Sequence, residues 1–254
     1  MNNHNIFDLN TLRLRQKKSL LLQNYDYFLH KEVGERLINR IKDITKNFDK
    51  TIEITSKPKL IKDILIKDNF FSSNKIKYFI RLGIGGEVNI NQELIPVLHN
   101  STDLIISNLT FHWANDLVGI LYQINQSLKP DGVFLASLFG ENTLIELKES
   151  FKIAENEILG KTFNRISPFI DIKTSGDLLQ RTGFKLCVSD LDRIEIKYDN
   201  PMDLLYELRS MGETNTLLER EKNFLRKDIL KKTMEIYTNN FSDDDNKVRA
   251  TFDI

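Results

Sequence analysis

The stretch that decides the fold runs over residues 103–140. It opens with DLIISNLTFHWANDL at residues 103–117, an apolar run followed by a turn that is rich in aromatic side chains. It continues through LKPDG at 128–132 into VFLASLFG at 133–140. A continuous apolar run is typical of a strand that is buried on both faces of a parallel sheet. The order strand, turn, helix, turn, strand therefore predicts an α/β unit.

Upstream of this stretch, apolar spacing predicts two helices and two strands. Apolar side chains at helical spacing predict an amphipathic helix over residues 26–45. The β-branched run Thr51–Ile54 predicts a first strand, after which Pro58 opens a helix at a position where proline is favoured. Lys75–Leu82 predicts a second strand, which ends in the glycine-rich turn Gly83–Gly86.

Downstream, the same periodicity predicts three helices. Asp116 precedes an apolar series that predicts a helix up to Leu128, with the aspartate as its N-cap. A second series predicts a helix over residues 144–158. A third helix ends at Gly183, because glycine is common just after the last helical residue.

The last part of the chain mixes strands and charged helices. Lys185–Ser189 and Arg193–Tyr198 predict two strands joined by a polar turn. A helix is predicted after Pro201, and a charged helix is predicted over residues 216–238. Val248–Ile254 predicts the beginning of another strand.

These elements predict the fold class and the domain organisation. Strands that alternate with helices, followed by a final strand pair, predict a mostly parallel sheet with one antiparallel edge. We divide the chain into an N-terminal helical segment at residues 1–48 and an α/β domain at 49–200. A C-terminal helical cap with a truncated strand follows at 201–254.

The composition argues against several kinds of partner. The 254 residues include 36 basic and 36 acidic side chains, so the net charge is zero and gives no attraction to nucleic acid or to an anionic membrane. The sequence contains no run of about 18 apolar residues, so no membrane span is predicted. The single Cys187 excludes an internal disulfide, as is usual in a reducing compartment. The basic segment 13–18 predicts a charged helix, with a transit-like segment as the alternative.

Several motifs resemble one known family in their order and spacing. They are NLTFHWANDL at residues 108–117, KPDGVF at 129–134 and, beyond the common core, LRSMGETN at 208–215. The chain resembles the methyltransferase-like assembly factor of respiratory complex I, a mitochondrial family with bacterial counterparts within the class I S-adenosylmethionine-dependent methyltransferases. It is more distantly similar to the malonyl-carrier-protein methyltransferase of biotin synthesis.

The resemblance implies a Rossmann-like class I methyltransferase fold, with S-adenosylmethionine at the carboxyl ends of the strands. It also implies a protein partner, either a complex I subunit or an assembly intermediate, and peripheral membrane contact through that partner. The implied location is the cytoplasm of a bacterium or the mitochondrial matrix of a eukaryote. Arginine hydroxylation has been attributed to the family, and it is a further implication of the resemblance.

The sequence departs from the family where the cofactor is expected. Glu53 fills the acidic place of the first motif, but Thr55, Lys57 and Lys59 stand where glycines let the backbone approach the cofactor closely. The second strand carries Arg81 near its end, without the carboxylate that would bind the ribose hydroxyls. The segment after this strand is shortened, and the chain ends before a further strand of the family. These departures predict a degenerate cofactor site.

Four residues are the candidates for cofactor binding. Glu53 and Thr55 belong to the first motif, and Ser107 and Asn108 lie at the carboxyl end of the central strand. A methyl donor or a substrate would lie at that end of the strand. Hydrogen bonds that cap a buried strand explain Ser107 and Asn108 equally well.

His112 and Trp113 follow the buried central strand, at the edge where α/β sites form. We predict that His112 is a catalytic general base and that Trp113 faces the substrate. The alternative is a packed turn with Trp113 in the core. One histidine and the carboxylate of Asp116 are too few ligands for a metal ion, so no metal site is predicted.

Three further candidates lie near the end of an amphipathic helix. Arg209, Glu213 and Asn215 are predicted to bind substrate as a cap over the pocket, and the alternative is a plain helix terminus. The charge-rich segment Glu219–Lys232 is a solvated face that could also dock a partner. The Gly83–Gly86 turn lacks the full spacing of a nucleotide-binding loop, which favours a plain turn.

Three functions are consistent with these patterns. The first is a methyltransferase-fold protein with a degenerate S-adenosylmethionine site, which acts by binding a protein assembly intermediate. The second is an active S-adenosylmethionine-dependent methyltransferase that modifies a protein or a carrier-bound acyl group. The third is an arginine hydroxylase, as attributed to the family.

Overall fold

The computed structural model describes residues 5–22, 26–57, 59–91 and 93–254. The chain forms two compact units. Unit 1 contains residues 1–15, 139–171 and 190–254, and unit 2 contains residues 16–138 and 172–189.

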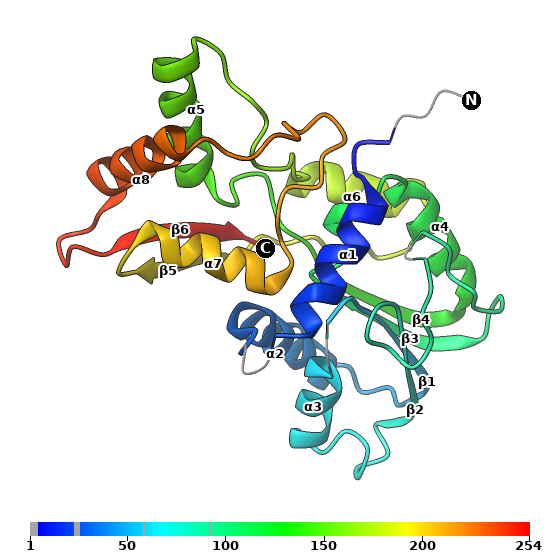
Figure 1. Cartoon of the computed structure of the whole chain (residues 1–254). Helices are drawn as coiled ribbons and strands as arrows, with labels where there is room; N and C mark the ends of the chain where they lie inside the picture. Colours follow the sequence, from blue (N-terminus) through cyan, green and yellow to red (C-terminus); the bar gives the residue numbers. More distant parts are fainter. Residues whose placement is uncertain (1–4, 23–25, 58, 92) are drawn as a thin grey trace. The chain divides into compact units, whose positions relative to one another are not determined.

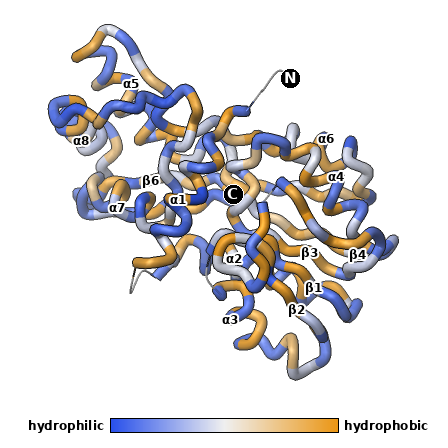
Figure 2. The backbone as a smooth tube through the Cα atoms, turned by 45° about the vertical axis from the view of Figure 1, so that its right-hand side comes forward, coloured by the Kyte–Doolittle hydropathy of each residue, from blue (hydrophilic) through white to orange (hydrophobic). Residues whose placement is uncertain are grey.

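Unit 2 is built on a four-stranded parallel sheet with the strand order β2-β1-β3-β4 (Figure 1). Its strands are β1 (Phe48–Ile54), β2 (Ile76–Leu82), β3 (Thr102–Asn108) and β4 (Leu128–Ser137). The structure confirms all four predicted strands. Every residue of β3 is buried, as its continuous apolar run predicts. Figure 2 shows the hydrophobic character of the sheet along these strands.

The turn predicted at Lys129–Gly132 lies inside β4 rather than before it. Thr102 pairs with Leu128 and Leu104 pairs with Val133, so the intervening residues form a bulge in a strand that continues on both sides. Proline and glycine are tolerated there because a bulge interrupts the regular ladder of hydrogen bonds.

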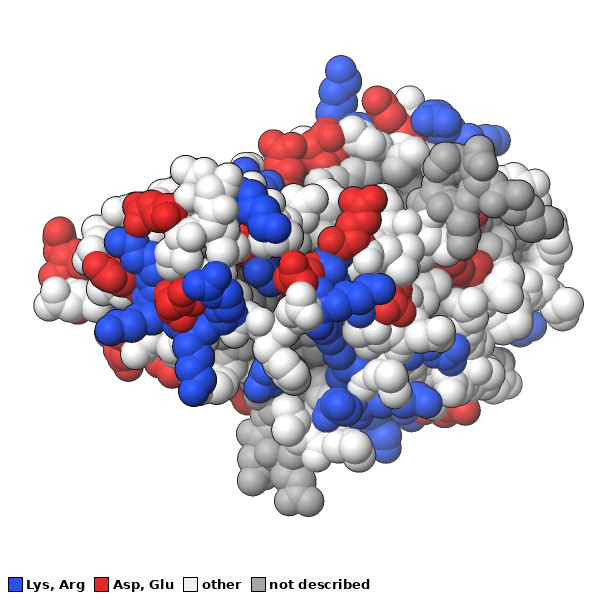
Figure 3. Space-filling view, turned by 45° about the horizontal axis from the view of Figure 1, so that its top comes forward, with Lys and Arg blue, Asp and Glu red and all other residues white. Residues whose placement is uncertain are grey.

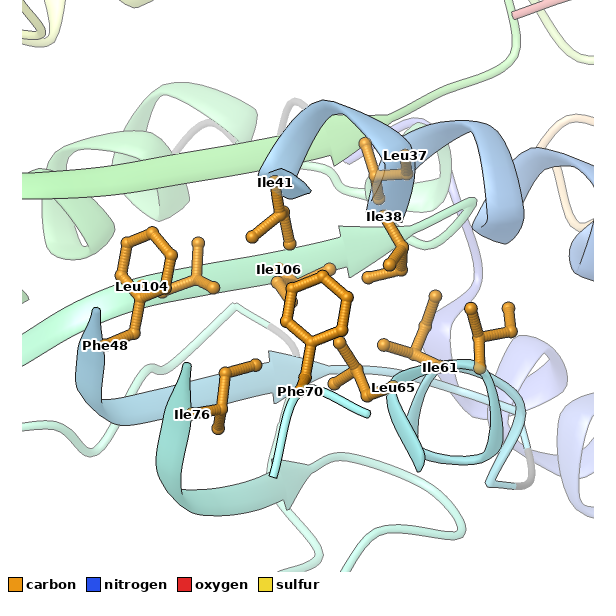
Figure 4. Packing of buried hydrophobic residues seen from close by; sticks show 11 residues of the cluster. Leu37, Ile38, Ile41, Phe48, Ile61, Leu65, Phe70, Ile76, Leu104 and Ile106 are labelled. Atoms are coloured by element: carbon orange, nitrogen blue, oxygen red, sulfur yellow. The ribbon is translucent and has the colours of Figure 1, made fainter. Parts of the chain in front are cut away.

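Helices cover both faces of this sheet. α2 (Phe28–Lys42) and α3 (Leu60–Lys67) cover one face. α4 (Leu117–Ser127) packs on the opposite face, and α6 (Ile172–Arg181) contacts α4. The cluster under α2 and α3 consists of Leu37, Ile38, Ile41, Phe48, Ile61, Ile64, Leu65, Phe70, Ile76, Leu104 and Ile106 (Figure 4). Burying each such side chain stabilises the fold by about 1.5–3 kcal/mol.

The start of α4 confirms a prediction about its cap. The side chain of Asp116 accepts a hydrogen bond of 2.8 Å from the Gly119 N–H, which satisfies one of the free donors of the first turn. The apolar series predicted for this helix lies on its buried face. The start predicted for α3 at Pro58 lies outside the described residues, and α3 begins at Leu60.

Unit 1 contains a two-stranded antiparallel sheet and three helices. The strands are β5 (Arg193–Tyr198) and β6 (Val248–Asp253), and the helices are α5 (Ile145–Leu159), α7 (Pro201–Met211) and α8 (Lys227–Phe241). The hydroxyl of Tyr237 on α8 donates to the Arg249 carbonyl of β6 at 2.8 Å. The carboxylate of Glu146 on α5 accepts from the Thr251 N–H at 3.1 Å. These bonds attach both helices to the same strand.

The N-terminal helix α1 (Leu9–Leu20) confirms the charged helix predicted there. It begins in unit 1 and ends in unit 2. Asp8 precedes it, and its carboxylate accepts from the Thr11 N–H at 3.0 Å, so it caps the first turn of the helix.

Two predicted elements are wrong. Lys185–Ser189 is not a strand, because Leu186 has a positive φ of 54° and its side chain is 99% exposed. The partner of β5 is β6 instead. The charged helix predicted over 216–238 begins only at Lys227, because the backbone at Thr216 and Leu218 forms hydrogen bonds with residues 6–8 rather than within a helix.

Candidate functional site at the carboxyl edge of the sheet

The carboxyl ends of three neighbouring strands bring the predicted cofactor residues together in unit 2. Ile54 of β1 pairs with Leu82 of β2 on one side and with Ser107 of β3 on the other. The loop with Thr55 leaves the sheet beside Ser107 and Asn108. In parallel sheets, ligands bind at this edge because the loops that follow the strands converge there.

Glu53 is a buried acid one residue before the end of β1. It lies directly opposite Arg81 of β2, and its side chain is 1% exposed. Burial raises the pKa of Glu53 to about 8, although the Arg81 charge and a hydrogen bond with the Thr55 side chain act in the opposite direction. At neutral pH, the folded chain therefore holds this carboxyl group largely in its protonated form.

The guanidinium group of Arg81 forms its hydrogen bonds with Glu87. The Arg81 guanidinium donates from Nη2 to Glu87 Oε1 at 3.0 Å and from Nε at 3.1 Å. The Arg81 backbone N–H also donates to Glu87 Oε2 at 2.8 Å. These bonds hold the pKa of Glu87 below its ordinary value, although burial acts in the opposite direction. A carboxylate is therefore present near the end of β2, but it is bonded to the chain itself.

Sequence reasoning missed Glu87, and the glycine turn was the signal that could have found it. Gly83 donates its N–H to the Val88 carbonyl at 2.8 Å, so the chain reverses directly after β2. This reversal brings residue 87 alongside residue 81. The plain turn favoured for Gly83–Gly86 is therefore what this segment forms.

The same turn packs against the loop that follows β1. Gly83 has a φ of +122°, and a Cβ atom built on it would lie 2.0 Å from the Thr55 carbonyl oxygen. No other residue type fits there without a shift of the backbone. Gly83 thus lets the turn after β2 approach the loop after β1 closely.

Side chains fill the loop after β1. Thr55, Ser56 and Lys57 are all buried, with 2%, 0% and 2% of their surface exposed. The Thr55 hydroxyl accepts from the Lys57 N–H at 3.1 Å, which holds the loop in a tight turn. Lys59 is exposed at the start of α3.

Asn108 is held by hydrogen bonds at the end of β3. Its side-chain amide donates to the His30 carbonyl at 2.8 Å and its oxygen accepts from the Ser137 hydroxyl at 2.9 Å. Ser137 Oγ in turn accepts from the Leu109 N–H at 3.0 Å. These contacts attach β3 to α2 and β4, so they support the strand-capping interpretation of Asn108.

Four buried polar atoms at this edge have no hydrogen-bond partner among the described residues. They are Glu53 Oε2, Ser56 Oγ, Arg81 Nη1 and Ser107 Oγ. Because most buried polar atoms in proteins are hydrogen-bonded, these four are the places where ordered water or a polar ligand would bind. All four belong to β1, β2, β3 or the loop after β1.

His112 and Trp113 lie in a short 3-10 helix, η1 (Phe111–Trp113), just after β3. Their rings are in contact, with centroids 5.3 Å apart, and the side chains are 8% and 3% exposed. The Glu93 carboxylate accepts from the Asn115 N–H at 2.6 Å and so fixes the path between η1 and α4. The roles of general base and substrate contact stay predictions.

Arg209, Glu213 and Asn215 belong to unit 1, whereas His112 and Trp113 belong to unit 2. Arg209 is exposed in the last turn of α7, and Glu213 is buried.

The side chain of Asn215 already has partners within unit 1. Its amide donates to the Asn164 carbonyl at 2.8 Å and its oxygen accepts from the Leu217 N–H at 2.9 Å. The substrate-binding roles predicted for Arg209, Glu213 and Asn215 therefore stay predictions.

The surface and the ligand inventory add three observations. Basic and acidic side chains are interspersed on the face shown in Figure 3. Within the described residues, no group of three or more His, Cys, Asp or Glu side chains could hold a metal ion. None of the helices in the described ranges combines the length and the apolar character of a membrane span.

A family model and several relatives match this chain. Residues 77–136 match the model described as a methyltransferase domain, so β1 and the loop after it lie outside the match. The protein named Arginine-hydroxylase NDUFAF5, mitochondrial, from Homo sapiens is 34% identical over 98% of this chain and 75% of its own length. Its Danio rerio counterpart is also 34% identical, over 98% of this chain and 81% of its own length.

More distant matches support the fold. The malonyl-[acyl-carrier protein] O-methyltransferase of Xylella fastidiosa is 34% identical over 63% of this chain and 52% of that enzyme. The solved YcgJ protein of Bacillus subtilis has a TM-score of 0.54 at 12% identity, covering 85% of this chain and 94% of that one. A candidate methyltransferase of Bacillus halodurans also has a TM-score of 0.54, at 10% identity, covering 87% and 95%. The predicted Rossmann-like class I methyltransferase fold is confirmed.

The approach of the two loops predicts a large effect of Gly83→Ala. The added Cβ would meet the Thr55 carbonyl at 2.0 Å, so we expect the variant to lose more than about 3 kcal/mol of unfolding free energy in urea titrations. Gly160→Ala is the matched control, because Gly160 also has a positive φ of +66° but no atom within 4 Å. We expect it to lose only about 1–2 kcal/mol. Equal losses would show that backbone conformation alone, and not the approach to Thr55, restricts Gly83.

The buried carboxyl of Glu53 predicts a pH-dependent stability. The folded chain keeps the proton up to about pH 8, whereas an ordinary glutamate releases it near its pKa of 4.5. Between these values the folded chain binds more protons, so the unfolding free energy falls as pH rises, by at most about 1.4 kcal/mol per pH unit. We expect Glu53→Gln to remove this contribution when urea unfolding is compared at pH 5 and pH 8.

The control for this comparison is the exposed Glu149, changed in the same way. Glu149→Gln is expected to keep the pH dependence of the wild-type chain. A Glu53→Gln variant that also keeps it would mean that Glu53 is ionised in the folded chain at neutral pH.

Proposed function

The chain belongs to the family of the mitochondrial arginine-hydroxylase NDUFAF5, and we propose that it acts as a protein-binding assembly factor with a degenerate S-adenosylmethionine site. The methyltransferase fold provides the scaffold. The proposal depends on whether the cofactor edge of that scaffold is open to a ligand or filled by side chains of the protein.

One observation carries the proposal: side chains occupy the loop after β1. A cofactor at the carboxyl edge of the sheet needs a close approach to this loop, which only residues without a Cβ atom allow. Here Thr55, Ser56 and Lys57 are buried in the loop, and its backbone packs against Gly83. The methyltransferase-domain match begins at residue 77, beyond this loop, which also supports the proposal.

The charges at this edge support the same interpretation. Ribose hydroxyls donate hydrogen bonds to a free carboxylate, but the carboxylate nearest the end of β2, Glu87, is bonded to Arg81. Glu53 is largely neutral at pH 7 because burial raises its pKa to about 8. The residues at this edge therefore do not fit S-adenosylmethionine, and we assign them no role in methyl transfer.

The proposed partner is a protein, namely a complex I subunit or an assembly intermediate. Arg209 is exposed on α7 and is available for such a contact, whereas Trp113 is 3% exposed and contributes packing. Any membrane contact would then be peripheral and made through the partner. The relatives are named as mitochondrial, which supports the mitochondrial matrix as the place of action in a eukaryote. In a bacterium, the proposed place of action is the cytoplasm.

An active methyltransferase is the second candidate. The observation that favours it is the group of four buried polar atoms without partners, because a polar ligand at the edge of the sheet would satisfy them. The names of the relatives mention both arginine hydroxylation and methyl transfer to a carrier-bound malonyl group. These activities stay alternatives for this chain.

Calorimetric titration with S-adenosylmethionine and S-adenosylhomocysteine tests the degenerate site. We expect no heat of binding up to millimolar ligand, which corresponds to an affinity weaker than about −4 kcal/mol. The variant Thr55→Gly/Lys57→Gly/Lys59→Gly is expected to regain measurable binding if glycine loss is the main defect. A circular dichroism spectrum shows that each protein tested is folded.

Two results would contradict this part of the proposal. Micromolar binding by the unmodified chain would show that the loop after β1 accommodates the cofactor. Turnover of any methyl acceptor would show that the chain is an enzyme and not only a binding protein.

The binding role predicts a dependence of complex I assembly on Arg209 and Glu213. In a host that lacks its own member of the family, we expect Arg209→Ala with Glu213→Ala to lower the amount of assembled complex I, measured by native gel electrophoresis. The exposed Arg181→Ala is the control, because it lies in the last turn of α6 as Arg209 lies in that of α7. Assembly that stays unchanged in the double variant would remove these residues from the contact surface.

A further inference from the structure

Three arginines of unit 1 gather around the loop that follows α7. Arg15 lies on α1, Arg209 lies in the last turn of α7, and Arg220 lies within the loop. Arg15 donates from Nη1 to the Asn215 carbonyl, and Arg220 donates from Nη1 to the Leu217 carbonyl at 2.7 Å. Two guanidinium groups are therefore anchored on the same loop by one of their donors each.

Residues at the start of α1 hold the Arg220 side chain in place. Arg220 Nη2 donates to the Asp8 carboxylate at 3.0 Å and lies 3.1 Å from the Thr11 hydroxyl. Thr11 and Arg15 are four residues apart on the helix, so they lie on the same face, one turn from each other. This spacing places the guanidinium groups of Arg15 and Arg220 in the same neighbourhood.

Like charges act on Arg15 within this cluster. Burial lowers the pKa of Arg15, and the positive charges of Arg220 and Arg209 lower it further, whereas Asp8 raises it. Asp8 is the one carboxylate with this effect among the described residues, and it is already bonded to Arg220. Arg209 is exposed and forms no ion pair with any described residue.

We propose that Arg15, Arg209 and the Asp8-bound Arg220 form a binding site for a carboxylate group. A planar guanidinium binds a carboxylate through two parallel hydrogen bonds, and Arg15 and Arg209 have donors left for such a pair. Asp8 shows that the cluster already accepts one group of this chemistry. A second carboxylate would reduce the repulsion between the arginines, and it could come from an acidic protein segment or from a small carboxylic acid. This site stands on unit 1 alone and does not depend on the proposed function.

The test is calorimetric titration of the full chain at constant ionic strength. The probes are a capped hexaglutamate peptide, tricarballylate as a small carboxylic acid, and inorganic phosphate. We expect a carboxylate probe to bind more tightly than phosphate. Tighter binding of the peptide identifies an acidic protein segment as the source, and tighter binding of tricarballylate identifies a small carboxylic acid.

Two matched variants separate a specific site from general charge attraction. Arg209→Gln is expected to weaken binding of the carboxylate probe by about tenfold or more, because the substitution removes charged hydrogen bonds to the ligand. Arg181→Gln removes an equally exposed arginine from the last turn of α6 and is expected to leave binding unchanged. Because Arg209 is exposed, its replacement should not unfold the chain, which the unfolding midpoint in urea checks.

Three results would overturn the site. They are an absence of binding by the unmodified chain up to 10 mM of either carboxylate probe, phosphate binding more tightly than both, and equal effects of Arg209→Gln and Arg181→Gln. Because S-adenosylmethionine itself carries a carboxylate, its titration is repeated with Arg209→Gln: heat that this variant keeps belongs to the sheet of unit 2 and does not bear on the arginine site.

Discussion

The close approach of Gly83 to the Thr55 carbonyl is the constraint on which the site in unit 2 depends. It requires glycine at residue 83 and permits side chains in the loop after β1, because the turn after β2 supplies the space that this loop needs. The resulting reversal delivers Glu87 to Arg81. With Arg81 engaged, Glu53 faces it from β1 as a buried acid with a pKa of about 8. Burial is the main cause of this raised pKa, and the close approach of the two loops fixes the position of Glu87 beside Arg81.

The sequence predicts the fold of unit 2 well, because its elements are specified by local patterns. A continuous apolar run identifies β3, and an apolar period after an N-cap aspartate identifies α4. The errors arise where long-range pairing decides. β5 pairs with β6, which is some fifty residues away in the chain, so the apolar character of Lys185–Ser189 indicates no strand. Likewise, the segment after Thr216 bonds to residues 6–8, which no helical period can reveal.

The candidate site could be predicted only in part, for the same reason. Motif position identifies Glu53 and Thr55, and strand position identifies Ser107 and Asn108, because these residues follow strands that local patterns specify. Glu87 was not identified, since its place depends on the number and conformation of the residues in a turn. The arginine cluster of unit 1 was recognised only through Arg209, because Arg15 joins it from the distant N-terminal helix and Arg220 depends on the conformation of the loop after α7.

The fold can persist when its cofactor edge changes because the two depend on different residues. The core under α2 and α3 consists of aliphatic and aromatic side chains from helices and strand interiors. Thr55, Lys57 and Lys59, which differ from the family motif, lie beyond the end of β1, whereas Glu53, which matches the motif, belongs to the strand. The proposed loss of glycines there removes no apolar contact of the core, so the fold does not depend on the cofactor site for its packing. What the loss does require is a compatible neighbour, and the glycine turn after β2 provides it. On the proposed function, a methyltransferase fold that loses one close backbone approach and gains another stays stable as a scaffold, and its surface can bind other ligands.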